Sequence, residues 1–275
     1  MVFFSNCKIN LGLHITAKRA DGFHDLETIF YPLPLYDVLE LMPADETAVM
    51  LYGLPIPGST ENNIVWKAWH LLKQDLPDLP PVCFHLLKNI PAGAGLGAGS
   101  ANGATALMAL NRFFNLQLPQ KQLLKYALHL GSDCPFFVLN SPCYATGRGE
   151  VLRPVSLNLA AYYLAVINPG IHISTPWAFS RVTPAPPVHS LETLANLPPS
   201  QWEPLVTNDF EPLVFEAYPE VRAIKTRLLE MGAVFAAMTG TGSTVFGLFK
   251  HQPDMTTFPE TYFTKCLCLN EPLLH

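Results

Sequence analysis

A glycine-rich run at residues 91–105 constrains this chain more than any other feature. It reads Pro-Ala-Gly-Ala-Gly-Leu-Gly-Ala-Gly-Ser-Ala-Asn-Gly-Ala-Thr, so that glycines alternate with small or apolar residues before a serine. Glycine lets backbone N–H groups turn inward and approach a ligand closely. A helix that starts just after such a loop adds free N–H groups and the positive end of its dipole. The run therefore predicts a site for phosphate oxygens.

The segments on either side support this interpretation. Residues 82–90 have the apolar pattern of a strand, with Val82, Phe84 and Leu86 on one face, and residues 101–114 have apolar residues at helical spacing. The run lacks both the Gly-Lys-Ser/Thr ending of a P-loop and the strict G-x-G-x-x-G spacing, so a tightly packed turn stays an alternative. A strand, a glycine loop and a helix in succession are nevertheless what phosphate binding requires.

Composition limits the function classes. The 275-residue chain is 49% hydrophobic and 14% charged, which is typical of a folded protein with a sizeable core. A formal net charge of −5 and scattered basic residues give no reason to expect nucleic acid or an anionic membrane as a partner. The sequence shows no signal peptide and no run of about 18 apolar residues, and its six cysteines fit no disulfide framework or zinc site. We therefore expect a cytoplasmic protein with reduced thiols.

Strands and helices are mixed along the chain without regular alternation, which favours an α+β fold over a doubly wound parallel sheet. Strands are expected over residues 8–16, 26–41, 82–90, 143–155 (a pair), 160–168, 233–238 and 243–249, and helices over 63–73, 101–114, 120–130 and 221–231. Pro32 and Pro34 are expected to break the second strand, and Glu61 with Asn62 to cap the first helix. Residues 184–204 are rich in proline and predict a loop with one short helix, and a domain boundary is expected near residues 150–158.

Lys8, Asn10 and Asp133 are candidate catalytic or binding residues. Lys8 and Asn10 lie two apart on a predicted strand and so share a face, although a solvated face is the alternative because lysine is mostly exposed. Asp133 precedes Cys-Pro-Phe-Phe and could be a helix N-cap with Pro135 in the first turn. It could instead be a general base, because a carboxylate among apolar side chains suits proton transfer.

Two short segments suggest binding surfaces. Phe23 and His24 follow an acidic turn, where the histidine is either structural or, with the aromatic ring, recognises a flat base by stacking and edge contacts. The segment Thr-Gly-Thr-Gly-Ser at residues 239–243 is either an ordinary hairpin loop or a second set of N–H groups for an anionic ligand.

Three segments resemble, in the right order, the three motifs of the GHMP kinase superfamily: residues 8–13 (Lys-Ile-Asn-Leu-Gly-Leu), the run 91–105, and residues 238–243 (Met-Thr-Gly-Thr-Gly-Ser). Further segments resemble the signature of the 4-diphosphocytidyl-2-C-methyl-D-erythritol kinase family within it, namely residues 19–28, 61–62, 131–136, 147–150 and 208–212.

The resemblance implies a two-domain α+β fold, with an N-terminal ATP-binding domain over residues 1–155, a C-terminal ferredoxin-like domain over residues 156–275 and the active site between them. It implies phosphoryl transfer from ATP to the C2 hydroxyl of a cytidine-diphosphate-linked methylerythritol in the non-mevalonate isoprenoid route. Mg²⁺ is expected to come with the ATP, held mostly by phosphate and water because no acidic cluster marks a metal cage. The implied partner is a small molecule, and the oligomeric state, monomer or homodimer, stays open.

The resemblance also implies residue roles. Asp133 matches the catalytic base and Lys8 the cation beside it, which suits a weakly nucleophilic tertiary hydroxyl. The implied ATP-binding residues are Pro91, Gly93, Ala94, Gly95, Leu96, Gly97, Ala98, Gly99 and Ser100 around the phosphates, with Asn62 and Lys88 near the adenine. The implied acceptor-binding residues are Asn10, Phe23, His24, Phe30, Thr175, Phe179, Gly240 and Thr241. Two positions depart from the pattern, Phe23 where many members have Tyr and Thr239 where Ser is more usual.

Two other functions compete with this one. Another GHMP kinase, acting on homoserine, mevalonate or isopentenyl phosphate, would keep the three motifs but has no reason to carry Gly-Phe-His with Phe30 and Phe179. A non-catalytic nucleotide-binding module would be expected to lose Asp133 or Lys8, and this chain has both.

Overall fold

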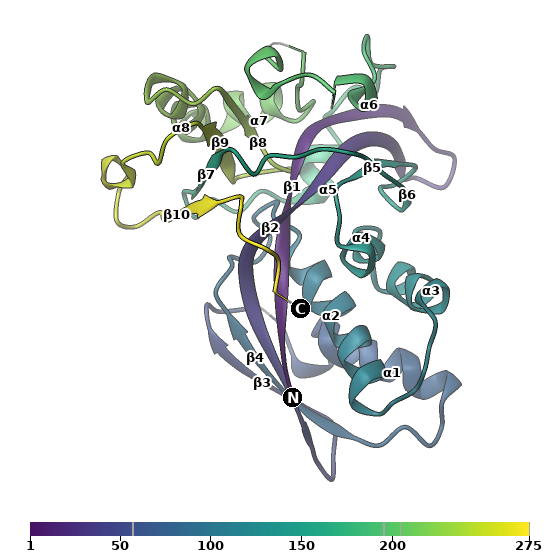
Figure 1. Ribbon diagram of the computed structural model, residues 1–275. Coiled ribbons are helices and arrows are strands. Elements are labelled where there is room, and N and C mark those ends of the chain that lie inside the picture. Colours follow the sequence, from purple (N-terminus) through teal and green to yellow (C-terminus); the bar gives the residue numbers. More distant parts are fainter. Residues whose placement is uncertain (57, 195, 204, 275) are drawn as a thin grey trace.

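The computed structural model describes residues 1–56, 58–194, 196–203 and 205–274 and is built around two sheets, as Figure 1 shows. The larger sheet has six strands: β1 (Val2–Lys18), β2 (His24–Pro43), β3 (Ala48–Gly53), β4 (Val82–Lys88), β5 (Cys143–Thr146) and β6 (Val151–Pro154). They follow the order β3-β4-β2-β5-β6, with β1 paired along the length of β2. All pairs are antiparallel except β3 with β4.

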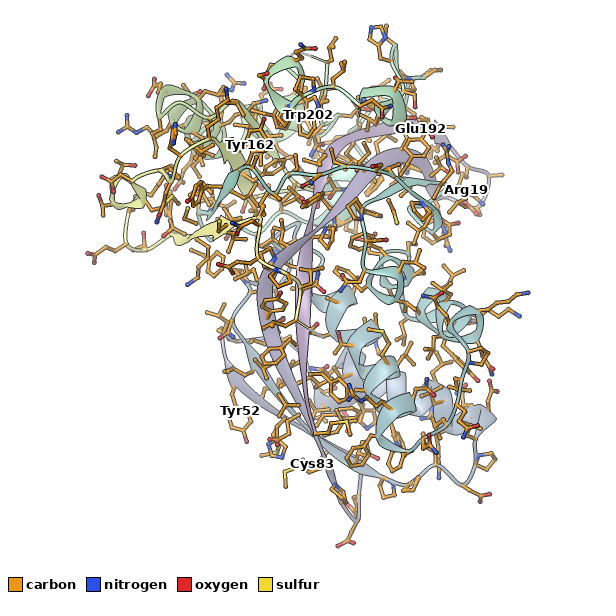
Figure 2. All side chains as sticks on the ribbon, in the orientation of Figure 1. Arg19, Tyr52, Cys83, Tyr162, Glu192 and Trp202 are labelled. Atoms are coloured by element: carbon orange, nitrogen blue, oxygen red, sulfur yellow. The ribbon has the colours of Figure 1, made fainter. Side chains whose placement is uncertain are left out.

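Four helices cover one face of this sheet: α1 (Ile64–Asp75), α2 (Ala98–Phe113), α3 (Gln120–Leu130) and α4 (Cys134–Leu139). The expected apolar face of β4 is confirmed, since Val82, Phe84 and Leu86 are buried in the core beneath these helices. Tyr52 projects from the opposite face, which the helices leave open (Figure 2). Around β3 and β4 the sheet is therefore buried on one side only, as the alternating burial along β4 requires, whereas the middle of β1 is buried on both faces.

The smaller sheet is antiparallel and lies in the second half of the chain. Its strands are β7 (Tyr163–Asn168), β8 (Phe235–Met238), β9 (Val245–Phe249) and β10 (Phe263–Cys268), in the order β10-β7-β9-β8. The accompanying helices are α5 (Thr175–Phe179), α6 (Leu191–Leu194), α7 (Glu211–Ala217) and α8 (Pro219–Glu230), and the short 3₁₀ turns of the chain are η1 (Thr60–Asn62), η2 (Pro199–Gln201) and η3 (Met255–Thr257). The expected α+β class is confirmed.

The long hairpin of β1 and β2 joins the two sheets. Ile9 and Leu11 of β1 pack in one buried cluster with Leu164 of β7 and Phe246 of β9. Leu13 of β1 also donates its N–H to Thr207 O in the second half of the chain. The motif that begins at Lys8 therefore lies where the two sheets meet.

The expected break in the second strand is wrong, because β2 runs unbroken through Pro32 and Pro34. On one edge β2 pairs with β1, where the register shifts beside Asn6 and Cys7. On its other edge β5 pairs as far as Phe30 and β4 begins only at Val38. Proline has no backbone N–H to donate to a neighbouring strand. A strand therefore tolerates proline where the register shifts and where no second strand pairs with it, as here between Phe30 and Val38.

Two helix starts also differ from expectation. The N-cap of α1 is Asn63, whose side chain accepts from Val65 N, while Glu61 and Asn62 lie in η1. Helix α2 begins at Ala98, directly after Gly97, rather than at Ala101. The glycine run therefore ends in the first turn of a helix, which gives it the free N–H groups that anion binding needs.

The loop expected at residues 184–204 contains α6 and η2; residues 195 and 204 within it lie outside the described part of the chain. Strands β3 and β10 and helices α5 and α7 were not expected, whereas α4 is the helix that the N-cap interpretation of Asp133 predicted. Over the described ranges, no helix combines the length and apolar character that a membrane crossing needs.

Candidate active site

A cavity of about 730 Å³ opens where β1 and β2, the glycine loop, the start of α4, α5 and the β8–β9 turn meet. Its wall contains thirteen of the residues that the sequence predicted: Lys8, Asn10, Phe23, His24, Phe30, Gly93, Gly95, Gly97, Asp133, Thr175, Phe179, Gly240 and Thr241. These residues come from segments up to 233 positions apart (8 to 241), so the fold alone brings them together.

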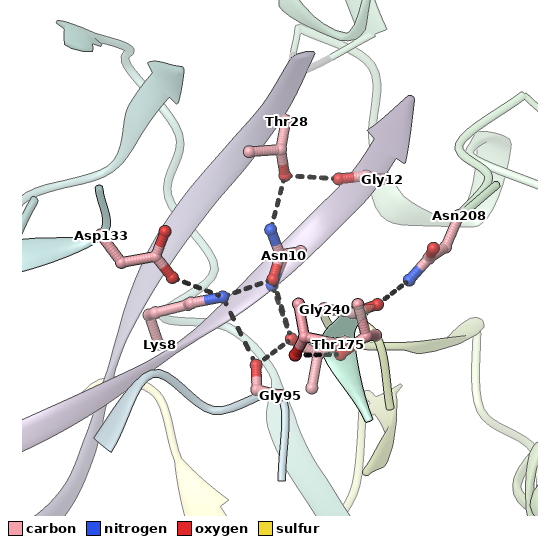
Figure 3. A network of polar contacts seen from close by, with 11 residues as sticks. Lys8, Asn10, Gly12, Thr28, Gly95, Asp133, Thr175, Asn208 and Gly240 are labelled. Atoms are coloured by element: carbon pink, nitrogen blue, oxygen red, sulfur yellow. Dashed lines mark hydrogen bonds and ion pairs between the residues drawn. The ribbon is translucent and has the colours of Figure 1, made fainter. Parts of the chain in front are cut away.

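Lys8 and Asp133 form the polar centre of this cavity. Lys8 is buried, with 4% of its side chain exposed, so the alternative of a solvated strand face is wrong. Its Nζ lies 3.6 Å from Asp133 Oδ2 and donates to Asn10 Oδ1 at 2.5 Å and Gly95 O at 3.4 Å, as Figure 3 shows. Asp133 occupies the N-cap position of α4, yet its side chain makes no capping bond and is 34% exposed. The carboxylate is thus free to meet a ligand.

Burial and charge act in opposite directions on Lys8. Removal from water lowers the pKa of the Lys8 ammonium below its ordinary value, while the neighbouring Asp133 carboxylate raises it. Around Nζ the structure places three acceptors, the oxygens of Asn10, Gly95 and Asp133. An ammonium has three donors and no acceptor, so this set matches the protonated side chain.

The glycine loop packs tightly against the other motifs. Gly93, Gly95 and Gly97 all have positive φ, and Gly97 is the N-cap of α2. A Cβ at Gly95 would overlap the Thr239 carbonyl oxygen, and one at Gly97 would lie 2.9 Å from Lys8 Cε. Glycine is required at both positions by conformation and by space.

The β8–β9 turn is fixed by side chains from two other segments. Thr239 Oγ1 accepts from Asn10 N at 2.9 Å and lies within donor distance of Asn10 Oδ1 (3.2 Å) and Gly95 O (3.1 Å). Asn208 Nδ2 donates to Met238 O and Gly240 O at 2.8 and 2.9 Å. The turn is therefore more than a hairpin loop, because it connects the motif of β1 with the glycine loop.

Aromatic side chains form the far end of the cavity. The His24 and Phe179 rings lie 5.2 Å apart, and Phe30 is buried beside Lys8, whose Nζ is 4.9 Å from the ring centre. Phe23 is 52% exposed, and the Arg148 guanidinium lies 4.7 Å from its ring. This end offers flat apolar surfaces with one polar ring edge, which suits a planar heterocycle.

A second cavity of about 190 Å³ adjoins the first, and Gly93 lines both. Its wall includes the predicted residues Asn62, Lys88 and Gly99. The Lys88 ammonium forms an ion pair with the fully buried Asp37 and donates to Asn102 Oδ1 at 2.9 Å. The loop thus separates a large cavity with the Lys8–Asp133 pair from a small one beside α1 and β4.

The remaining predicted loop residues are on the wall of neither cavity. They are Pro91, Ala94, Leu96, Ala98 and Ser100. The side chains of Ala94, Leu96 and Ala98 pack into the core shared by the two sheets. These residues can contribute backbone groups, and Ser100 a hydroxyl in the first turn of α2.

Comparison with known proteins decides the family. The model of the GHMP kinases N terminal domain matches residues 63–141, and that of the GHMP kinases C terminal domain matches residues 189–257. A 4-diphosphocytidyl-2-C-methyl-D-erythritol kinase from Parabacteroides distasonis is 45% identical over 95% of this chain and 97% of its own length. One from Bacteroides fragilis is 47% identical over 93% and 94%. The chain belongs to the 4-diphosphocytidyl-2-C-methyl-D-erythritol kinase family.

The solved structures agree with membership of this kinase family. A crystal structure of a 4-(cytidine 5'-diphospho)-2C-methyl-D-erythritol kinase is 31% identical, with a TM-score of 0.74 over 90% of each chain. A homoserine kinase from Cytophaga hutchinsonii is 17% identical with a TM-score of 0.60 over 96% and 95%, which shows a common fold alone. As a GHMP kinase, the chain is an enzyme that transfers phosphoryl groups from ATP to a small molecule.

Sequence analysis assigned no role to several polar residues around the site of this GHMP kinase, although Thr28, Asn102 and Asn208 lie in segments that carried the resemblance. Asp37, Thr28, Asn102 and Asn208 are buried and hydrogen-bond to site residues or loop backbone. A lone polar residue in an apolar strand, such as Asp37 in Leu-Tyr-Asp-Val-Leu, was the available signal, because a buried charge is costly unless it is paired.

Proposed function

We propose that this chain phosphorylates the C2 hydroxyl of 4-diphosphocytidyl-2-C-methyl-D-erythritol with ATP. The observation that carries the proposal is the Lys8–Asp133 pair on the wall of the large cavity, with the glycine loop on one side and the aromatic end on the other. The substrate is the one that the names of the relatives give, and the cavity wall has polar and aromatic surfaces that match the different parts of this substrate.

Asp133 acts as the general base. Its exposed carboxylate accepts the proton of the tertiary hydroxyl as the oxygen attacks the γ-phosphorus of ATP. Lys8 holds the carboxylate in place and offsets negative charge on the phosphoryl group in transfer. The N–H groups of the glycine loop and the first turn of α2 bind the ATP phosphates.

The two cavities hold different substrates. The adenine side of ATP lies in the small cavity beside Asn62 and Lys88, and its phosphates cross the glycine loop towards Asp133. The methylerythritol lies near Asn10 and Thr175, and the cytosine near Phe23, His24, Phe30 and Phe179. Residues 1–155 thus supply the ATP side, and residues 156–275 supply Thr175, Phe179, Gly240 and Thr241 to the acceptor side.

We also propose that Mg²⁺ enters with ATP. This ion prefers oxygen ligands and keeps several waters, with few protein ligands beside substrate phosphates. The Ser100 hydroxyl in the first turn of α2 fits such a role, because it lies at the end of the glycine loop. When bound, the ion neutralises phosphate charge.

An ATP-turnover assay over a panel of acceptors tests the proposal. The panel contains the cytidine compound, its uridine counterpart, methylerythritol phosphate without a base, homoserine and mevalonate. We expect efficient turnover with the cytidine compound only, because a pocket that hydrogen-bonds one base leaves polar groups unpaired with another. Equal turnover of the compound without a base would reduce the conclusion to an unspecified GHMP kinase.

A further inference from the structure

A bulge in β1 turns one backbone carbonyl towards the site. Leu11 pairs with Ile29 and Leu13 with Thr28, so Gly12 is the extra residue between them. Gly12 has a φ of +72°, and a Cβ there would lie 2.5 Å from Leu191, so only glycine fits. Its carbonyl accepts a hydrogen bond from Thr28 Oγ1 at 2.6 Å (Figure 3).

This bond determines what Thr28 offers to Asn10. A hydroxyl has one hydrogen, and a carbonyl can only accept, so the Thr28 hydrogen is used on Gly12. Towards Asn10, Thr28 Oγ1 therefore presents a lone pair, and the atom that faces it at 2.9 Å is the donor Asn10 Nδ2. This contact orients the amide with Oδ1 on the opposite side, where the Thr239 hydroxyl also lies within donor distance at 3.2 Å.

The fixed amide in turn holds the lysine. Asn10 Oδ1 faces Lys8 Nζ at 2.5 Å, and Lys8 Nζ faces Asp133 Oδ2 at 3.6 Å. A flipped amide would direct its NH₂ group at the ammonium, and two donors cannot satisfy each other. The sequence of contacts runs from Gly12 through Thr28 and Asn10 to Lys8.

We propose that Thr28 is a positioning residue, which orients the Asn10 amide and through it keeps Lys8 protonated beside Asp133. Thr28 is fully buried and lies outside the cavity wall, so it acts without touching a substrate. The proposal rests on the function proposed above, because it assumes that the Lys8–Asp133 pair serves catalysis.

The test compares Thr28→Val, which keeps the shape but loses the hydroxyl, with Thr28→Ser, which restores it. The matched control is Thr244→Val, because Thr244 Oγ1 is also buried and accepts from an asparagine, Asn168 Nδ2, at 2.9 Å, yet does not line the cavity. We expect Thr28→Val to lower kcat by about tenfold, as loss of one well-placed hydrogen bond does, with the KM for ATP within about twofold. Thr28→Ser and Thr244→Val should keep kcat near that of the parent.

The pH profile supplies a signature that a structural role would not give. Lys8 faces the Asp133 carboxylate at the start of α4 and the Phe30 ring of β2, together with the uncharged oxygens of Asn10 and Gly95. The Cys7 thiol, one residue before it on β1, packs in the apolar cluster between the sheets. Loss of the Asn10 acceptor disfavours the ammonium, so in Thr28→Val the alkaline limb of kcat moves to lower pH. A side-chain NMR titration of Lys8 should show the same shift without turnover.

Three results would overturn the inference: an unchanged Lys8 titration in Thr28→Val, equal losses of kcat in Thr28→Val and Thr244→Val, or no rescue by Thr28→Ser. Thr28→Cys carries the same test if the valine variant does not fold, because a thiol is a weak donor and acceptor of nearly the same size. Failure of the proposed function is distinguishable, since the parent enzyme would then not turn over the cytidine compound at all.

Discussion

The two charges at the centre of the site differ sharply in exposure. Asp133 can meet a substrate hydroxyl because a third of its side chain is open, whereas Lys8 is enclosed by fixed acceptors. The carboxylate is held by its position at the start of α4, and the ammonium by hydrogen bonds to Asn10 and Gly95 and by the ion pair with Asp133. An ammonium held in place in this way needs no reorganisation when negative charge develops beside it.

Substitution of Asp133 should separate chemistry from binding. We expect Asp133→Asn to lower kcat by a factor on the order of 10² or more, because it removes the proton acceptor, with ATP affinity nearly unchanged. Single-turnover kinetics and ATP titration measure the two effects. Normal turnover in this variant would assign the base to another residue.

The rate of the parent enzyme should fall at alkaline pH earlier than an ordinary lysine would predict. Burial lowers the pKa of Lys8, and the protonated form is the one that neutralises charge, so activity is lost as the pH rises through this lowered value. A kcat–pH profile measures this loss of activity at alkaline pH. Lys8→Met should have low activity that does not fall in the same alkaline range. An alkaline limb that persists in Lys8→Met would belong to a different group.

The histidine at the aromatic end should determine which base is accepted. Stacking on Phe23 tolerates any base, so discrimination needs the polar edge of His24. We expect His24→Ala to raise the KM for the cytidine compound and to reduce its preference over the uridine compound, while the KM for ATP stays constant. An unchanged preference in steady-state assays of His24→Ala would place base recognition elsewhere.

At the scale of elements, a buried network fastens both ends of the glycine loop. The Asp37 carboxylate accepts from Asn89 N and Ile90 N at 2.8 and 3.0 Å where the loop begins, and from Asn102 Nδ2 at 3.0 Å where α2 continues it. Lys88 neutralises the same carboxylate. A loop held in this way keeps its N–H groups pre-arranged, as the proposed binding of phosphate requires.

Gly99 offers a way to test phosphate binding without disturbing the fold. It lacks a positive φ, and a Cβ there would meet no atom within 4 Å, although the residue lines the small cavity. We expect Gly99→Ala to keep or slightly raise the melting temperature, because alanine favours a helix over glycine, and to raise the KM for ATP roughly tenfold by occupying phosphate space.

Thermal unfolding and kinetics of Gly99→Ala should be measured on the same preparation, with the acceptor KM as the internal control. Gly95→Ala is the contrasting variant, since its Cβ would overlap the Thr239 carbonyl and it should lose stability as well. An unchanged KM for ATP in a stable Gly99→Ala protein would move the phosphates away from the start of α2.

The elements that sequence predicted well are those whose local pattern and tertiary context agree. Helix α3 ends at Leu130 before Gly131 as expected, and its apolar spacing matches the buried face formed by Leu123, Tyr126 and Ala127. Strand β2 was predicted poorly, because the tolerance of Pro32 and Pro34 depends on where β4 and β5 pair, which no local pattern contains.

The site shows the same division. Lys8, Asn10 and Asp133 were found through motifs of residue types that chemistry needs. No role could be assigned to Thr28 or Asp37, because their importance lies in partners 16 and 51 positions away in sequence, Gly12 and Lys88. Hydrogen-bond partners at such separations are set by sheet register rather than by composition.

At the scale of the whole molecule, the shared core predicts one unfolding unit. One buried cluster joins Ile9 and Leu11 of the larger sheet to Leu164 and Phe246 of the smaller sheet, so the two halves of the chain share part of their core. We expect a single cooperative transition for both halves of the chain.

Tryptophan fluorescence can test this, because Trp66 and Trp69 lie in α1 whereas Trp177 and Trp202 lie in the second half of the chain. A variant in which phenylalanine replaces both tryptophans of one half retains fluorescence from the other half only, so the two variants report the unfolding of each half separately. Coincident midpoints in urea are expected; midpoints that differ by more than the error of the fit would show two independently folding domains.

The position of Thr239 also limits how such enzymes can be recombined. Its hydroxyl contacts the backbone or side chain of Asn10 and the carbonyl of Gly95, so three segments from distant parts of the gene meet at one atom. A chimera that joins the first half of this chain to the second half of a relative inherits Asn10 and Gly95 from one parent and residue 239 from the other. Serine in place of Thr239 would keep the hydroxyl but remove a methyl group from a fully buried place, so we expect substitutions at these three positions to be non-additive in their effects on stability.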